Sequence, residues 1–234
     1  MPERCLLYYI TDRSQFPGDE WARRKALLAK IIEAAGAGVN YIQLREKDLT
    51  VHELEALAIA ALSAIREGTA QRTENRKPET RLLINSRTDI ALAVGAAGVH
   101  LRSDDVAPSE VRRIWSLCGV DALARERPMI AISCHSKVEV LGAESDGADF
   151  AVLAPIFGKK GSTALGLEVL RECCQPGIPV LALGGVTLQN AAACLEGGAA
   201  GIAGIRLFQE NPMAEVVRTL RSGNAWKDDE HQQS

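Results

Sequence analysis

An eightfold alternation of strand-like and helix-like segments constrains the fold of this chain more than any other feature of its sequence. The strand-like runs are apolar, four or five residues long, and most of them are followed by a helix-like segment. These runs are Leu6–Ile10, Tyr41–Leu44, Arg81–Ile84, Gly98–Leu101, Met129–Ile132, Phe150–Leu153, Pro179–Leu183 and Gly201–Gly204. Eight successive β-α units predict an α/β protein with a single (β/α)8 fold, a TIM barrel.

Helix-like segments fill the intervals between these runs and follow the last one. The second begins with a capping-box pattern, in which Glu53 follows Thr50 by three positions. The expected helices are Trp21–Ala35, Val51–Arg66, Ile90–Val94, Ser109–Cys118, Lys137–Ser145, Gly166–Cys174, Leu188–Glu196 and Met213–Arg221. A dinucleotide-binding sheet is disfavoured because no Gly-x-Gly-x-x-Gly motif follows the first strand. We predict one barrel domain over residues 1–225 and a polar C-terminal tail over residues 226–234.

Composition and charge restrict the class of protein. The 47% apolar content supplies a large core, and the formal net charge of −3 gives no support for nucleic-acid binding. No apolar run approaches the ~18 residues of a membrane span, and Met1–Arg4 leads directly into a strand-like run without a signal-peptide core. The six cysteines form no Cys-x-x-Cys pair. We expect a cytoplasmic protein without nucleic-acid or membrane partners, and leave a homo-oligomer open.

The end of the second strand carries the strongest candidate for a functional site. Gln43, Arg45 and Lys47 alternate, so they would share one face of an extended segment. Arginine binds phosphate oxygens bidentately and lysine acts as a mobile point charge. Because barrels place active sites at the carboxyl ends of their strands, we predict an anion-binding mouth here. The alternative is that both cations form ordinary salt bridges with Glu46 or Asp48.

The loops after the sixth, seventh and eighth strands carry further candidate phosphate ligands. Lys159 and Lys160 lie in a glycine-flanked segment that suits a mobile lid, the alternative being a solvated surface loop. Gly184 and Gly185 permit close backbone approach of a phosphate, although tight turns alone also require glycine. Arg206 adds a positive charge after the eighth strand.

Two other strand ends carry candidate metal-binding and acid–base groups. Asp104 and Asp105 follow the fourth strand and would suit Mg²⁺, which takes one or two carboxylates together with substrate phosphates. Their alternative role is a favourable charge at the start of the next helix. His135 follows the fifth strand as a candidate general acid or base, or as a structural hydrogen-bonding residue at the barrel rim.

A set of motifs spread along the chain is more specific than any single residue. They are Ile10-Thr-Asp-Arg13, Gln43-Leu-Arg-Glu-Lys47, Leu82-Leu-Ile-Asn85, Asp89-Ile-Ala-Leu-Ala93, Gly98-Val-His-Leu101, Ala148-Asp149, Pro155-Ile-Phe157 and Ala182-Leu-Gly-Gly-Val186. From about Leu6 to Phe208 the chain resembles the thiamine phosphate synthases and their sister group, the thiazole tautomerases. The synthases join a hydroxymethylpyrimidine diphosphate to a thiazole phosphate carboxylate and release pyrophosphate and CO₂.

This resemblance implies roles for residues at the strand ends. The side chains facing the pyrimidine diphosphate would be those of Gln43, Arg45, Lys47 and Asn85. Ser133 would contact pyrophosphate. The thiazole phosphate would bind on the backbone at Gly185, Ile205 and Arg206. Small phosphorylated molecules are therefore the expected partners.

The same resemblance implies Mg²⁺ as cofactor, with Asp105 as one of two metal-binding aspartates. The second aspartate of the family pattern is replaced by Ser86, and the usual Gly-Gln before the fourth-strand aspartates is Arg102-Ser103. The usual Thr-x-Thr-Lys of the sixth loop is Lys159-Lys-Gly-Ser162. Loss of one carboxylate weakens the predicted metal site, and Arg102 or Lys159 would partly replace the charge of the cation.

Three functional hypotheses follow. The leading one is a thiamine phosphate synthase with an altered metal site, in which Arg45, Lys47, Lys159 and Lys160 stabilise the departing pyrophosphate. The second is a thiazole tautomerase, in which His135 moves a proton and no metal is required. The third is a non-catalytic barrel that binds phosphates of the thiamine pathway.

Overall fold

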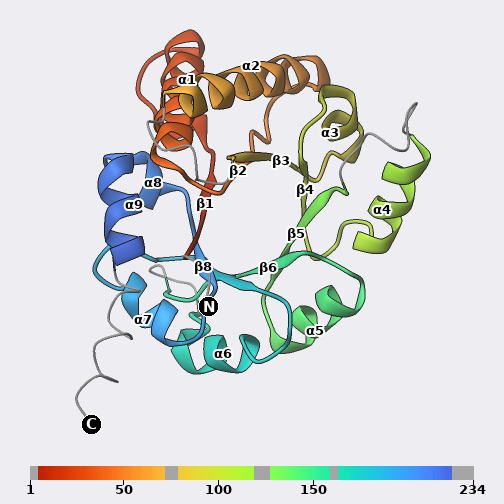
Figure 1. The fold of residues 1–234 in the computed structure, drawn as a ribbon, viewed down its shortest axis with the longest axis vertical. Coiled ribbons are helices and arrows are strands. Elements are labelled where there is room, and N and C mark those ends of the chain that lie inside the picture. Colours follow the sequence, from red (N-terminus) through yellow and green to blue (C-terminus); the bar gives the residue numbers. More distant parts are fainter. Residues whose placement is uncertain (1–4, 72–78, 119–126, 159–162, 223–234) are drawn as a thin grey trace.

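Eight parallel strands close into a barrel in sequence order, and β8 pairs with β1 to complete the ring (Figure 1). This computed structural model describes residues 5–71, 79–118, 127–158 and 163–222. The strands are β1 (Leu6–Ile10), β2 (Tyr41–Leu44), β3 (Arg81–Asn85), β4 (Gly98–Leu101), β5 (Met129–Cys134), β6 (Phe150–Leu153), β7 (Val180–Ala182) and β8 (Gly201–Gly204). The predicted TIM barrel is confirmed.

Helices form a ring around this barrel (Figure 1). They are α1 (Glu20–Ala37), α2 (Val51–Ala70), α3 (Thr88–Val94), α4 (Pro108–Leu117), α5 (Lys137–Ser145), α6 (Gly166–Cys173), α7 (Ala191–Glu196), α8 (Arg206–Gln209) and α9 (Met213–Ser222), with a 3₁₀ turn η1 (Arg13–Gln15) after β1. The capping box at Thr50 and Glu53 is present. No described helix is long and apolar enough to cross a membrane.

Most elements differ from the sequence prediction by one to four residues at one or both ends, and the difference at α7 has a local reason. Helix α7 begins at Ala191 instead of Leu188, because the Asn190 side chain accepts a hydrogen bond from the Thr187 N–H and donates one to the Gly185 carbonyl. Such side-chain bonds compete with helical backbone bonds. Strand β7 spans Val180–Ala182 only. The proposed domain boundary at residue 225 stays a prediction, since residues 223–234 lie outside the described ranges.

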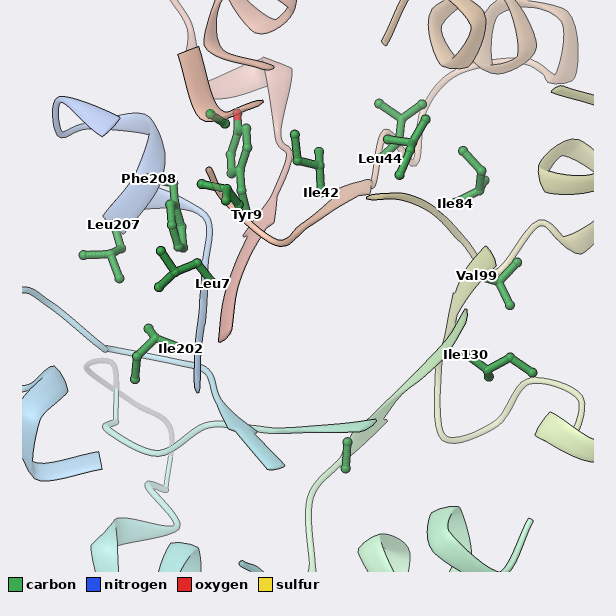
Figure 2. Packing of buried hydrophobic residues seen from close by; sticks show 14 of the residues in the cluster. Leu7, Tyr9, Ile42, Leu44, Ile84, Val99, Ile130, Ile202, Leu207 and Phe208 are labelled. Carbon is green, nitrogen blue, oxygen red and sulfur yellow. The ribbon is translucent and has the colours of Figure 1, made fainter. Parts of the chain in front are cut away.

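Alternation along each strand divides the core into two parts. Outward-facing residues such as Leu7, Ile42 and Val99 point from the strands toward the surrounding helices (Figure 2) and belong to one large buried cluster. Inward-facing residues, among them Tyr8 and Phe150, fill the barrel in a second cluster. Residues of the second cluster therefore face the barrel axis. The inward-facing residues near the carboxyl ends of the strands form the floor of the site.

Candidate active site

Polar side chains replace apolar ones on the inward face where the strands end. Gln43 on β2 is 2% exposed, and its Nε2 donates a hydrogen bond of 2.8 Å to Asn85 Oδ1 on β3. The other amide atom, Gln43 Oε1, is buried without a hydrogen-bond partner. A buried unpaired acceptor costs about 1–3 kcal/mol, and active sites are where such a cost is tolerated. This acceptor is therefore available to an N–H donor of a ligand.

A buried ion cluster built on Arg13 holds the loop that follows β2. Arg13 is 4% exposed and its guanidinium contacts Glu46 at 3.0 Å, Asp48 at 2.7 and 2.8 Å, and Glu20 at 2.8 Å. The Arg13 backbone N–H and the Thr11 hydroxyl also donate to the Glu46 carboxylate. Both carboxylates that neighbour Arg45 and Lys47 in sequence are thus held by Arg13.

The environments of Glu46 and Asp48 in this cluster shift their pKa values in opposite directions. Burial raises the pKa of Glu46, and the hydrogen bonds from Thr11 and Arg13 offset only part of that rise. Asp48 is exposed, and the hydrogen bonds from Arg13 lower its pKa. Since a buried carboxylate is costly without a partner, Arg13 is the residue that allows Glu46 to stay charged inside the protein.

Arg45 and Lys47 consequently form no ion pair with any residue in the part of the chain that the structure describes. Arg45 is half-buried and its backbone N–H donates to Thr11 Oγ1 at 3.0 Å, while Lys47 is exposed. The charge of Arg45 acts on Asp12 and on His100, so its guanidinium lies at the mouth of the barrel. The salt-bridge alternative for these two cations is therefore wrong, and they remain available to an anion.

Asp105, Ser86 and Arg102 form a second polar cluster, at the ends of β3 and β4. The Ser86 hydroxyl donates to Asp105 Oδ2 at 2.6 Å, the Arg102 N–H donates to the same oxygen at 2.8 Å, and the Arg102 guanidinium lies 3.2 Å from Oδ1. Burial acts to raise the pKa of Asp105, but these hydrogen bonds outweigh it and the net shift is downward. Asp104 is 70% exposed and faces Arg102 at 3.3 Å.

The oxygen ligands available in this cluster limit which metal ion it could hold. Among the described residues no group of three or more His, Cys, Asp and Glu side chains is arranged to bind an ion. Asp105 offers one carboxylate, already in contact with Arg102, and Ser86 offers a neutral hydroxyl. The set fits Mg²⁺ only as an ion held largely by substrate phosphates, which is a common arrangement for this metal.

Ser133 lies on β5 within a buried hydrogen-bond chain that the sequence did not reveal. Its Oγ is 2.8 Å from His100 Nε2, and His100 Nδ1 is 2.9 Å from the Tyr8 hydroxyl. Burial, and then the charge of Arg45, lower the pKa of His100 to about 3, against a weaker opposing effect of Asp105. The sequence signals for His100 are its place in the Gly98-Val-His-Leu101 motif and its inward register on β4, where it pairs with Asn85 and Ala131.

His135 is exposed just beyond β5. Its Nδ1 lies 2.7 Å from the Ala154 carbonyl oxygen, and its backbone N–H donates to Glu139. Because a carbonyl only accepts, Nδ1 carries the proton. Its Nε2 has no recorded partner among the described residues. The rim hydrogen bond expected as one alternative is therefore present, and it leaves a ring nitrogen free.

The loops after β7 and β8 offer mainly backbone groups, and few polar side chains, to a ligand. Gly184 and Gly185 have φ of 94° and 68°. A Cβ on either residue would lie 2.7–2.8 Å from Pro155 or Phe157, so tight packing against the loop after β6 already explains both glycines. Ile205 caps the short helix α8, and Arg206 is exposed. Phosphate binding by these four residues stays a prediction. Lys159 and Lys160 lie outside the described residues.

Comparison with known proteins identifies the family. The sequence model of thiamine monophosphate synthase matches residues 7–208, nearly the whole barrel. The chain belongs to the thiamine monophosphate synthase family. It is 38% identical to a putative thiamine-phosphate synthase 2 of Aquifex aeolicus, over 87% of this chain and 97% of that protein. It is 36% identical to the thiamine-phosphate synthase of Caldanaerobacter subterraneus, over 92% of each.

A solved structure agrees with this assignment. The thiamine phosphate pyrophosphorylase from Pyrococcus furiosus has a TM-score of 0.74 and 27% identity to this chain, covering 96% of it and 98% of that protein. The resemblance seen in the sequence motifs is confirmed at the level of the family.

Proposed function

We propose that this protein is a thiamine-phosphate synthase, which couples hydroxymethylpyrimidine diphosphate with thiazole phosphate carboxylate and releases pyrophosphate and CO₂. The observation that carries the proposal is the pair Arg45 and Lys47, which follow β2 and have no carboxylate partner in the described part of the chain, because Arg13 binds Glu46 and Asp48. Two unpaired cations beside a buried amide suit a substrate that joins a diphosphate to a heterocycle. The names of the relatives support the same activity.

The reaction we propose is dissociative. Pyrophosphate leaves first and gives a cation stabilised by the pyrimidine ring, and the thiazole nitrogen then attacks this cation. Arg45 and Lys47 stabilise the negative charge that develops on the leaving group. Charges that the protein already holds in place do not have to reorient during the reaction, as water molecules would. Gln43 orients the pyrimidine by accepting a hydrogen bond at its unpaired Oε1. Lys159 and Lys160 remain candidates for further positive charge toward the pyrophosphate.

Asp105 and the Ser86 hydroxyl are the residues we propose to hold Mg²⁺ against the diphosphate. Bound there, the ion would neutralise part of the negative charge on the departing pyrophosphate. The guanidinium of Arg102 already contacts Asp105 and supplies positive charge at the same place. We therefore expect weak Mg²⁺ binding in the absence of a phosphate ligand.

The direct test of this proposal is incubation of the purified protein with both substrates, with and without Mg²⁺. We expect thiamine phosphate and pyrophosphate in equal amounts, with CO₂ released from the thiazole carboxylate. Isomerisation of the thiazole carboxylate phosphate alone would instead identify a tautomerase. Tight binding of the substrates with no turnover of either would identify a non-catalytic barrel, and both outcomes would defeat the proposal.

Ser86→Asp is expected to raise the affinity for Mg²⁺ in the presence of pyrophosphate by about tenfold or more. The new carboxylate would lie next to Asp105, since Ser86 Oγ is 2.6 Å from Asp105 Oδ2. The backbone tolerates the change because Ser86 has φ of 58°, a conformation that aspartate and asparagine adopt more readily than most residues. Calorimetric titration of Mg²⁺ measures the effect.

Ser86→Asn is the matched control, because it shares the backbone preference of aspartate without the charge. Its Mg²⁺ affinity should stay near that of the wild type. Equal Mg²⁺ affinities in the aspartate variant and the wild type would show that position 86 does not face the metal.

The tautomerase remains a second candidate because of one observation at His135. Its Nδ1–H is fixed on the Ala154 carbonyl, and Nε2 has no partner among the described residues, so this nitrogen is a candidate to exchange a proton with a ligand. His135→Asn removes this base. A tautomerase would lose about 100-fold or more of its isomerisation rate, whereas synthesis of thiamine phosphate should fall only a few-fold. Assaying both reactions on both proteins separates the two functions, and we expect no detectable isomerisation by the wild type.

A further inference from the structure

A chain of three hydrogen-bonding side chains crosses the inside of the barrel below the mouth. Tyr8 on β1 reaches His100 on β4, and His100 reaches Ser133 on β5, at 2.9 and 2.8 Å. The rings of Tyr8 and His100 also stack, with centroids 5.6 Å apart. Tyr8 is completely buried and His100 is 3% exposed, so water does not compete for these bonds.

The direction of the two hydrogen bonds follows from the donors that are available. His100 is neutral near pH 7, so only one ring nitrogen carries a proton. Its Nδ1 is the hydrogen-bond partner that the structure records for the Tyr8 hydroxyl. If Nδ1 carried the proton, the Tyr8 proton would be buried without an acceptor, at a cost of about 1–3 kcal/mol. The favoured arrangement has Tyr8 donating to Nδ1 and the Nε2–H donating to Ser133.

This arrangement determines what the Ser133 hydroxyl can do. Its oxygen accepts from His100, and no other partner of that oxygen is recorded among the described residues. Its own proton is therefore free to be donated toward the barrel mouth. In the opposite arrangement Ser133 would donate to the ring and would present only lone pairs to an anion, which is repulsive.

We propose that Tyr8 and His100 are positioning residues that fix Ser133 as a hydrogen-bond donor to the pyrophosphate group. The inference rests on the proposed function in that the anion is taken to be the diphosphate of the pyrimidine substrate. His100 acts through Ser133 and does not touch the substrate. Its burial keeps the ring neutral and in one tautomer while the substrate binds and pyrophosphate leaves.

The tautomer of His100 is the first test, and it requires no substrate. Long-range ¹H–¹⁵N spectra of the wild-type protein at pH 7 should show the Nε2–H form for His100, one of the four histidines. The spectrum of His100→Gln, which lacks that signal, assigns it. Observation of the Nδ1–H form for His100 would overturn the proposal, because Ser133 would then donate to the ring.

Variants with pyrophosphate as ligand are the second test. His100→Asn should weaken pyrophosphate binding about 10- to 100-fold, the usual range for loss of a hydrogen bond to a charged group. His100→Gln should restore most of this loss, because the amide nitrogen of glutamine occupies the place of Nε2 and can still donate to Ser133. Equal losses of pyrophosphate affinity in the two variants would contradict the role of His100 as a hydrogen-bond donor to Ser133.

A double-mutant cycle with Ser133→Ala separates this role from a general structural one. If His100 acts only through Ser133, His100→Asn should cost little once the hydroxyl is gone. Additive losses would overturn the proposal. Tyr8→Phe should also weaken binding, whereas the matched control Tyr9→Phe should not, since the Tyr9 hydroxyl is buried without a partner and Tyr9 belongs to the outward-facing cluster.

The same variants distinguish failure of this inference from failure of the proposed function. A wild-type protein that forms no thiamine phosphate but shows the Nε2–H tautomer and the non-additive cycle would refute the synthase and keep the Ser133 arrangement. An active synthase in which the losses from His100→Asn and Ser133→Ala add would support the proposed function and refute the positioning role of His100.

Discussion

Arg45→Ala is expected to lower kcat/KM for thiamine phosphate formation by about 10²- to 10³-fold, with Lys47→Ala having an effect of similar order. Neither cation has a carboxylate partner among the described residues, because Arg13 holds Glu46 and Asp48. Their full charge is therefore free to stabilise the departing pyrophosphate. Steady-state kinetics at varied substrate concentration measure the loss.

The fold should survive both substitutions, because neither side chain packs in the core. Arg113→Ala is a matched control: Arg113 lies on α4, is 62% exposed and pairs with Glu110, so its loss should leave kcat/KM unchanged. Arg45→Lys should recover only part of the activity, since lysine keeps the charge but not the bidentate geometry. Turnover like that of the wild type in both alanine variants would refute the anion-binding mouth.

Arg13→Ala should lose more stability than any of the other substitutions we propose, about 3–5 kcal/mol in the free energy of unfolding. The substitution leaves the Glu46 carboxylate buried without its ionic partner, and the remaining hydrogen bonds, from the Thr11 hydroxyl and the backbone N–H of residue 13, come from neutral donors that do not replace the lost charge. For a chain of this length such a loss corresponds to a fall of about 10 °C in Tm. Chemical denaturation monitored by circular dichroism provides the measurement.

The double variant Arg13→Ala/Glu46→Gln tests the cause of this loss. A neutral amide in place of the carboxylate removes the unpaired charge, so we expect it to recover part of the stability that Arg13→Ala loses. Arg113→Ala again serves as the surface control, with a change within about 0.5 kcal/mol. If Arg13→Ala were as stable as that control, Arg13 would not be the residue that compensates Glu46.

The fold was predictable because its signal is repeated along the chain. Each β-α unit carries its own apolar run. The alternation predicted for Gln43, Arg45 and Lys47 applies only to Gln43, which is buried on β2, because β2 ends at Leu44. The shorter extent of α7 could not be predicted, because it depends on the side-chain bonds of Asn190 to the loop after β7.

The less predictable parts of the site depend on pairs of residues far apart in sequence. Arg13 and Glu46 are separated by 33 positions, and nothing in the sequence indicated that Arg13 would take the carboxylate beside Arg45. Tyr8 and His100 are separated by 92 positions. Their contact exists only because the closed barrel brings β1 and β4 to face each other across its interior. The periodicity of the sequence does not predict which inward-facing side chains meet there.

We propose that Arg45 and Lys47 bind the diphosphate at the barrel mouth while Arg13 keeps Glu46 and Asp48 away from them. A crystal structure of the protein with bound pyrophosphate tests this claim most directly. We predict pyrophosphate oxygens in contact with the Arg45 guanidinium, the Lys47 ammonium and the Ser133 hydroxyl, and an intact Arg13–Glu46 pair. Pyrophosphate bound elsewhere, or Arg45 paired with Glu46 in its presence, would contradict the account.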